Sequence, residues 1–262
     1  MAALGPIQDE LAAELCRMKE EACMAMFESD TCCDYEWRIH AHTAVLACGH
    51  HSHSQPALAK VIGVVNPYLS HFVPPSSALT GVINQRFFDF RFSLGKPYGF
   101  PAFEEAFDDQ ARILKAIMMS LDIPEQPLKL SGVVGDRSAL EKGGSINFAH
   151  TILVESYNPI PTSDGVLWDV VKSCPARDCA TRFSLETAVS LGTHELRALE
   201  VIDRQGDYVA PPDVRKVLNN ALVEVDFILH YHATCGFRAS PVKVRVLVDS
   251  VMPGVTMPGL TD

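Results

Sequence analysis

Histidines gather near the start of the sequence in a spacing that could bind a metal. The residues concerned are His40, His42, His50, His51 and His53. His40 and His42 alternate within an extended pattern, so both imidazoles would point from one face of a strand. Metal-dependent hydrolases use such pairs, with carboxylates completing the ligand set. Their signature continues with an Asp or His at fixed positions, where this chain has Ser52, Ser54 and Gln55. A metal-dependent enzyme or metal-binding protein is therefore the alternative function.

Eight cysteines are many for a chain of this length, and none forms a Cys-x-x-Cys pair. Most are expected to be buried small hydrophobic residues. Cys16 and Cys23 lie seven residues apart at the edge of the apolar stripe of a predicted helix, where a neighbouring chain could reach them. Cys174 and Cys179 could form a local disulfide or half of a metal site, although two ordinary thiols are the simpler interpretation.

Motifs of nucleophilic and phosphate-binding enzymes are absent from the sequence. There is no Gly-x-Ser-x-Gly, and no Gly-x-Gly-x-x-Gly follows a predicted strand. The segment 141–145 lacks the first glycine and the residue order of a phosphate-binding loop. His230 and His232 form a second His-x-His pair, but exposed strand faces carry such residues by default. We therefore expect neither enzymatic activity nor a cofactor.

The overall charge argues against a nucleic-acid partner. The chain has 262 residues, with 32 acidic and 22 basic side chains and a formal net charge of −10. Binding to a phosphate backbone needs a concentrated basic surface, and no run of Lys or Arg supplies one. The N-terminal residues do not form a secretory signal, and no apolar stretch of about 18 residues could span a bilayer. The sequence thus predicts a protein made in the cytoplasm, neither secreted nor membrane-bound.

Hydrophobic periodicity predicts an α+β fold. Helical spacing predicts an N-terminal helix at 8–29 and a central amphipathic helix at 102–121. Alternation of apolar residues predicts a mixed or antiparallel sheet from strands at 35–48, 60–65, 86–94, 128–134 and 146–157, and from a C-terminal hairpin at 223–231 and 242–248. Long loops at 49–84 and 158–220 and an extended C-terminal arm at 252–262 complete the expected fold.

The chain is expected to form one domain over residues 1–262. The segment 158–165, which contains two prolines and a glycine, is the best candidate for a boundary within it. Such a boundary would separate a helix-strand-strand-helix-strand core at 1–157 from the hairpin and arm at 166–262.

The order of predicted elements resembles the tail-terminator and neck proteins of tailed bacteriophages. The first 160 residues run helix, strand, strand, amphipathic helix and two strands, with the aromatic strand at 86–94 leading into the helix at 102–121. The segment 221–233 is similar to the long outer strand of those proteins. The resemblance rests on element order, without a diagnostic motif.

The resemblance implies a structural virion protein whose copies form a ring at the head-tail junction. Its partners would be further copies, the tail tube and the connector, without specific binding of nucleic acid. An acidic ring would let DNA slide through without sticking. A particle that oxidises after release could carry disulfides between subunits, for which the candidates are Cys16, Cys23, Cys174 and Cys179. A non-viral adaptor or assembly module is a further hypothesis that the sequence alone hardly separates from this one.

Overall fold

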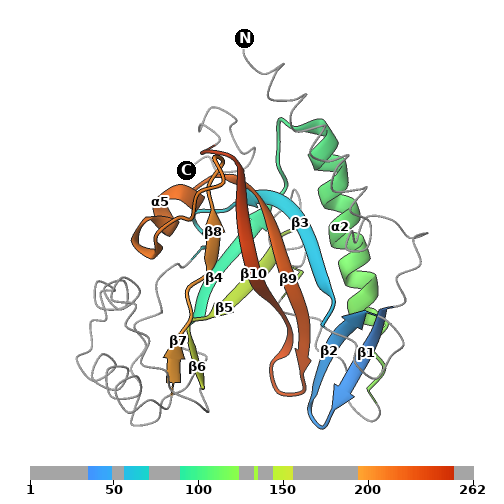
Figure 1. Ribbon diagram of the computed structural model, residues 1–262. Helices are drawn as coiled ribbons and strands as arrows, with labels where there is room; N and C mark the ends of the chain where they lie inside the picture. Colours follow the sequence, from blue (N-terminus) through green and yellow to red (C-terminus); the bar gives the residue numbers. More distant parts are fainter. Residues whose placement is uncertain are drawn as a thin grey trace.

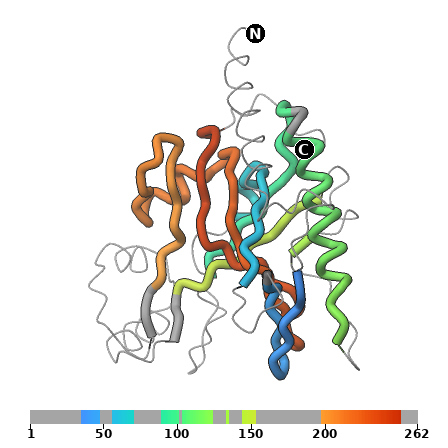
Figure 2. Tube along the Cα trace, turned by 45° about the vertical axis from the view of Figure 1, so that its right-hand side comes forward, coloured from blue at the N-terminus to red at the C-terminus, as the bar shows by residue number. Residues whose placement is uncertain are grey.

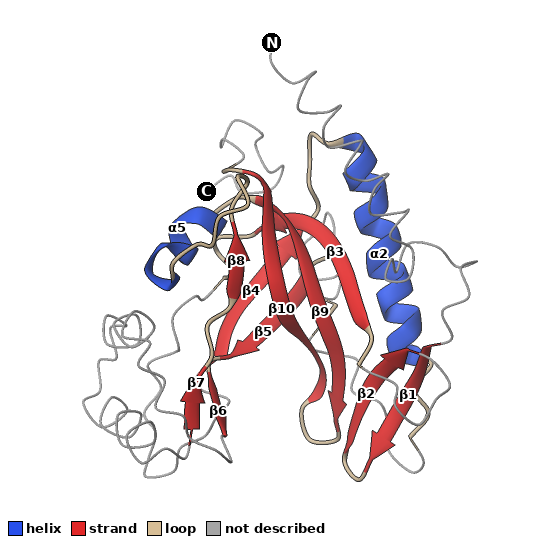
Figure 3. Ribbon diagram, in the orientation of Figure 1, coloured by secondary structure: helices blue, strands red, loops and turns tan. Residues whose placement is uncertain are grey.

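The computed structural model describes residues 35–48, 56–70, 89–123, 133–134, 144–155 and 194–250. In this part of the chain the fold is α+β and strands dominate, as Figure 3 shows. The helix expected at 8–29, the boundary at 158–165 and the arm at 252–262 lie outside it, and they stay predictions. Neither described helix combines the length and apolar composition that crossing a membrane requires.

The elements are β1 (Tyr35–His40), β2 (Thr43–Cys48), β3 (Leu58–Val65), β4 (Asp89–Gly95), α2 (Pro101–Met119), β5 (Ile146–Thr151), β6 (Leu153–Glu155), β7 (His194–Leu196), β8 (Glu200–Ile202), the 3-10 helix η2 (Pro211–Asp213), α5 (Val214–Leu218), β9 (Leu222–His232) and β10 (Gly236–Val248).

Five strands close into a barrel (Figure 1). The sheet order is β1-β2-β9-β3-β4-β5-β10-β8, and an additional pairing of β9 with β10 closes its middle part into a ring. β3, β4 and β5 form an antiparallel meander. β10 then runs parallel to β5 and antiparallel to β9, and β9 returns antiparallel to β3. The N-terminal strands and the C-terminal hairpin therefore belong to one sheet.

Alternating apolar residues fill the interior of the barrel, as the period of two in the sequence predicts. Phe90, Phe92 and Leu94 of β4 are all buried. The expected apolar face of β9 is also buried, with every second residue from Val223 to Tyr231 at most 1% exposed. Phe148 of β5 stacks on Phe92 at a centroid distance of 5.0 Å. Phe227 of β9 packs edge-on against Phe148 at a centroid distance of 5.3 Å, so this aromatic layer ties three barrel strands together.

The single strand expected at 35–48 is wrong, because the chain turns back after His40. β1 and β2 form a tight hairpin in which His40 pairs with Thr43. Ala41 adopts a left-handed conformation with a φ of 52°, which is uncommon for a residue other than glycine. The hairpin extends the barrel sheet, since β2 pairs with the end of β9 that β3 leaves free. Figure 2 shows it beside the tip of β9 and β10.

The apolar face expected for β10 is interrupted at Val242. The register of β10 against β9 shifts between Pro241 and Lys243, which indicates a β-bulge that inserts one residue into the ladder. Val242 is consequently 43% exposed, whereas Val244 and Val246 are buried as expected. The bulge allows a strand with an internal proline to stay in the sheet.

The helix expected at 102–121 is confirmed as α2, which covers the seam between β3 and β4. These strands pair only at Val64 with Gly95 and at Val65 with Leu94. Beyond that point the Ile62 amide donates to Gln110 Oε1 of α2 at 3.1 Å, so a helix side chain replaces the missing strand partner. At Gly63 a Cβ would lie 2.9 Å from both Leu94 Cβ and Phe107 Cε2. Glycine therefore permits the close approach of α2 to the barrel.

Candidate functional site

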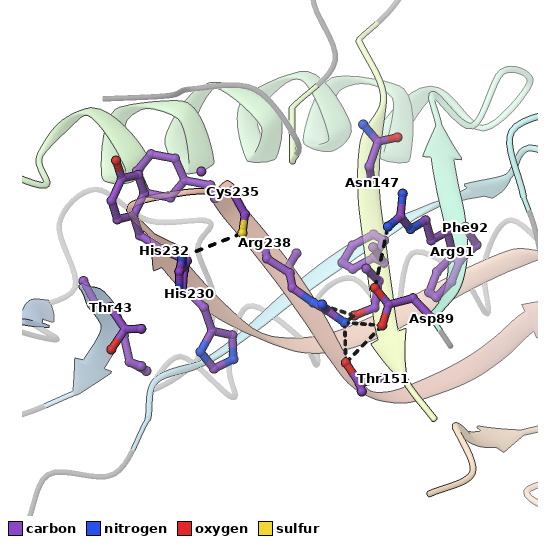
Figure 4. A pocket seen from close by; sticks show the side chains of 18 of the residues that line it. Thr43, Asp89, Arg91, Phe92, Asn147, Thr151, His230, His232, Cys235 and Arg238 are labelled. Carbon is purple, nitrogen blue, oxygen red and sulfur yellow. Dashed lines mark hydrogen bonds and ion pairs between the residues drawn. The ribbon is translucent and has the colours of Figure 1, made fainter. Parts of the chain in front are cut away.

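A groove of about 710 Å³ crosses the barrel surface over β4, β5, β9 and β10, and Thr43, Ala44 and Val45 of β2 also line it. Its polar side chains come from the outward positions of these strands, because the inward positions are filled by the core. The loop after β3 contributes Leu69 and the β9–β10 turn contributes Cys235. Figure 4 shows the side chains of the labelled lining residues Thr43, Asp89, Arg91, Phe92, Asn147, Thr151, His230, His232, Cys235 and Arg238.

A buried carboxylate organises two arginines in this groove. Asp89 is 2% exposed, and its Oδ1 accepts hydrogen bonds from Arg238 Nη2 at 2.9 Å and from Thr151 Oγ1 at 3.1 Å. Arg238 Nη2 also donates to the Ala149 carbonyl at 3.1 Å. Arg91 Nη2 lies 3.7 Å from Asp89 Oδ2, while 57% of the Arg91 side chain stays exposed. Arg238 is thus fixed, and Arg91 is available to an anionic ligand.

The charge of the groove differs in sign from the charge of the chain. Among the described residues that line it, Arg91 and Arg238 face one acid, Asp89. The groove is therefore positive even with neutral histidines, although the net charge of the protein is −10. Because charges beyond about 10 Å are screened at moderate salt, a ligand in the groove responds to the local charge. The inference from net charge alone missed this local excess.

His230 lies directly opposite Arg238 in the β9–β10 ladder. Burial lowers the pKa of His230 below its usual 6.5, and the neighbouring Arg238 charge lowers it further. The imidazole is consequently neutral at pH 7, with one nitrogen that donates and one that accepts. A neutral imidazole beside a fixed guanidinium suits a ligand that has both anionic and polar uncharged parts.

The turn between β9 and β10 places polar groups at one end of the groove. His232 Nδ1 accepts a hydrogen bond from the Thr234 amide at 3.2 Å. Cys235 Sγ lies 3.7 Å from the same nitrogen, and its side chain is an exposed free thiol. These contacts hold the turn in one shape beside the groove.

The sequence-predicted metal residues do not assemble in the described part of the chain. His40 ends β1 and His42 lies in the following turn, so they do not share the face of one strand. No group of three or more potential ligands is arranged to hold a metal ion among the described residues. His50, His51 and His53 lie outside them. Cys16, Cys23, Cys174 and Cys179 do so as well, and their role in disulfides stays a prediction.

Sequence reasoning missed both arginines of the groove. The outward position of Arg91 follows from the alternation of β4, but alternation also places charged residues on any solvated face. Asp89 and Arg238 are 149 residues apart, and only the barrel brings them together. No local spacing could have indicated this pair.

Known proteins provide structural matches without sequence matches. No protein-family model and no curated protein matches the chain. The single-stranded DNA-binding protein of bacteriophage Enc34, truncated at its C-terminus, matches over 83% of this chain and 96% of its own, with 8% identity and a TM-score of 0.39. The same protein in complex with single-stranded DNA matches over 81% and 94%, with 10% identity and a TM-score of 0.36. The bacteriophage T7 protein gp2.5, also a single-stranded DNA-binding protein, matches over 78% and 97%, with 11% identity and a TM-score of 0.38.

These matches correct the expectations that followed from element order. The interpretation as a tail-terminator or neck protein is wrong, because the similar structures are single-stranded DNA-binding proteins. The expected ring, the virion partners and the virion location followed only from that interpretation, so they are no longer supported. The expected absence of nucleic-acid binding is contradicted as well, since one match contains single-stranded DNA. None of these proteins is described as an enzyme.

Element order misled because many folds share a run of strands around one amphipathic helix, whereas pairing and closure distinguish them. A likeness at these TM-scores does not assign a function to this chain. The proposed function therefore rests on the geometry of the groove.

Proposed function

We propose that this protein binds single-stranded DNA in the groove over β4, β5, β9 and β10. The observation that carries the proposal is the fixed Asp89–Arg238 pair with the exposed Arg91 beside it, in a groove that is positive on an acidic protein. Arginines in a positive groove bind successive phosphates of a flexible strand. The excess of acidic groups elsewhere on the protein repels DNA from other surfaces.

The topology of the barrel supports the same location. A five-stranded Greek-key barrel, in which a meander is closed by a later hairpin, is the arrangement of OB folds. OB folds bind oligonucleotides and oligosaccharides on the face of their second and third strands, and on the loops that join the first to the second and the fourth to the fifth. Here those parts are β4, β5, the loop after β3 and the turn at Cys235. All four line the groove.

The charges favour a phosphate polymer over a neutral sugar. Arg91 keeps 57% of its side chain exposed beside the carboxylate, and desolvating this cation is compensated best by an anion. DNA is the first ligand to test because the similar structures are proteins that bind it. We propose that it works where DNA strands are separated, in the cytoplasm rather than in the virion.

The experiment compares two charge-matched variants, Arg91→Gln and Arg112→Gln. Arg112 lies on α2 with 76% of its side chain exposed, and it does not line the groove. Fluorescence anisotropy with a labelled oligothymidylate would give the dissociation constant over a range of salt concentrations. Loss of one phosphate contact reduces the slope of log K against log salt by about 0.7 for a single strand. We expect this reduction and weaker binding for Arg91→Gln.

Arg112→Gln should bind like the wild type, because it removes the same charge from a surface away from the groove. Equal behaviour of the two variants would overturn the proposed site, and absence of binding by the wild type at low salt would overturn the function. Unlabelled competitors of duplex DNA and of RNA with the same sequence measure the preference for a single DNA strand. A duplex that competes as well as the single strand would also count against the proposal.

A further inference from the structure

The loop that follows β3 carries the most exposed large hydrophobic side chain of the described chain. Tyr68 is 80% exposed, and the adjacent Leu69 is 43% exposed. Leu69 lines the groove together with Arg91. Tyr68 is therefore the sequence neighbour of a residue that lines the groove.

A network of hydrogen bonds holds residues 66–70, the described part of this loop, in one conformation. Asn66 Oδ1 accepts from the amides of Tyr68 at 2.9 Å and of Leu69 at 3.3 Å, which forms an Asx turn. Ser70 Oγ donates to the Asn66 carbonyl and accepts from the Ser93 amide. The Asn66 amide donates to the Ser93 carbonyl at 2.8 Å. Residues 66–70 are thus fixed to β4, two residues from Arg91.

The exposed position of Tyr68 is unusual because its backbone is so well fixed. An aromatic ring that is presented to solvent from an ordered turn loses little conformational entropy when a flat ligand binds. Every DNA base has such a flat face, and stacking on an aromatic side chain is tolerant of sequence. A strand whose phosphates contact Arg91 leaves its bases free to turn toward the rim of the groove.

We infer that Tyr68 stacks on a base of the DNA strand bound in the groove, with the Asn66 turn as the device that positions it. This inference rests on the proposed function and assigns a base contact to it. Arg91 then supplies affinity through phosphate, and Tyr68 supplies affinity through bases. The two contributions differ in what they require of the ligand, so they can be measured separately.

The test compares Tyr68→Ala, Tyr68→Phe and the control Tyr208→Ala on two ligands. Tyr208 is 55% exposed and does not line the groove. The first ligand is an oligothymidylate, and the second is an abasic strand with the same number of phosphates. Loss of a stacked base weakens binding by about 5- to 150-fold. We expect this loss for Tyr68→Ala on the oligothymidylate alone, with an unchanged salt slope, and wild-type binding for Tyr68→Phe and Tyr208→Ala.

Three results would overturn the inference. Tyr68→Ala could bind the oligothymidylate as well as the wild type does, it could lose as much affinity for the abasic strand, or Tyr68→Phe could be as weak as Tyr68→Ala. If Arg91→Gln still weakens binding in those cases, the proposed function stands and only the stacking fails. If the wild type binds neither ligand, the proposed function fails first and the stacking with it.

Discussion

Asp89 Oδ1 lies 2.9 Å from Arg238 Nη2, and this ion pair joins the second barrel strand to the last one beneath the groove. The carboxyl group is 2% exposed, whereas the Arg238 side chain is 31% exposed. The Asp89 carboxylate therefore has a structural role, whereas the Arg238 guanidinium faces the proposed ligand. The pair fixes the position of the guanidinium and offsets part of its positive charge.

Asp89→Asn should lower the free energy of unfolding by about 1–3 kcal/mol, because a neutral amide replaces the charged carboxylate that accepts the hydrogen bond of the Arg238 guanidinium. Urea denaturation at pH 7 measures the loss. Asp109→Asn is the matched control, since the Asp109 partner Arg112 is exposed on α2 and such surface pairs contribute less than about 1 kcal/mol. Equal effects of the two substitutions would show that Asp89 is not a buried structural acceptor.

Gly63→Ala should destabilise the protein by about 1–3 kcal/mol through overpacking. The added methyl group would meet Leu94 Cβ and Phe107 Cε2 at 2.9 Å, and neither strand nor helix can move away without opening the seam. Gly95→Ala, in the same β3–β4 ladder, is the control because its Cβ would find only the Val64 carbonyl at 3.9 Å. Thermal unfolding followed by circular dichroism compares them. A stable Gly63→Ala variant would contradict the close packing of α2.

The stability of the fold should fall as the pH decreases below about 6.5. His150 stacks on Phe90, its Nε2 lies 2.9 Å from the Arg197 carbonyl, and burial lowers its pKa below 6.5. The unfolded chain therefore binds a proton at a higher pH than the folded chain does. The resulting loss of stability begins near pH 6.5 and ends below the lowered pKa of the folded state.

His150→Gln should flatten this pH dependence, as measured by urea midpoints between about pH 7.5 and pH 5. Adding His230→Gln should flatten it further, because burial lowers the pKa of that imidazole too. A slope that neither substitution changes would mean that these rings are not held neutral by the fold.

Single-stranded DNA should protect Cys235 from alkylation. The thiol is exposed and lines the groove, so a bound strand would block a reagent such as iodoacetamide. Mass spectrometry of the peptide that contains Cys235 measures the rate with and without saturating oligothymidylate. A neutral polysaccharide at the same mass concentration should give no protection. Unchanged labelling in the presence of bound DNA would place the ligand elsewhere.

Local patterns predicted the faces of the strands, because a period of two depends only on neighbouring residues. The buried alternation of β4 and β9 and the amphipathic α2 follow from it. The turn at Ala41 could not be predicted in this way, since no glycine, asparagine or proline marks it. The bulge at Val242 likewise depends on the register against β9, which the sequence of β10 alone does not contain.

The candidate site could not be predicted from the sequence for a related reason. Its charge arises from residues on β4 and β10 that the closed barrel brings together, whereas the summed charge of the chain has the opposite sign. The histidines and cysteines became candidate site residues because their spacing can be seen within a short stretch of sequence. The groove depends on pairing between strands that lie far apart in the sequence.

The position of β9 determines when this protein can fold during its synthesis. β9 pairs with β2, β3 and β10, so one edge of each of these strands is covered by residues 222–232. As these residues emerge from the ribosome late, the earlier strands must wait with unpaired edges that are prone to aggregate. Barrels with such long-range pairing fold slowly compared with helical proteins of similar stability. A chain that is cut before β9 would leave these edges open permanently.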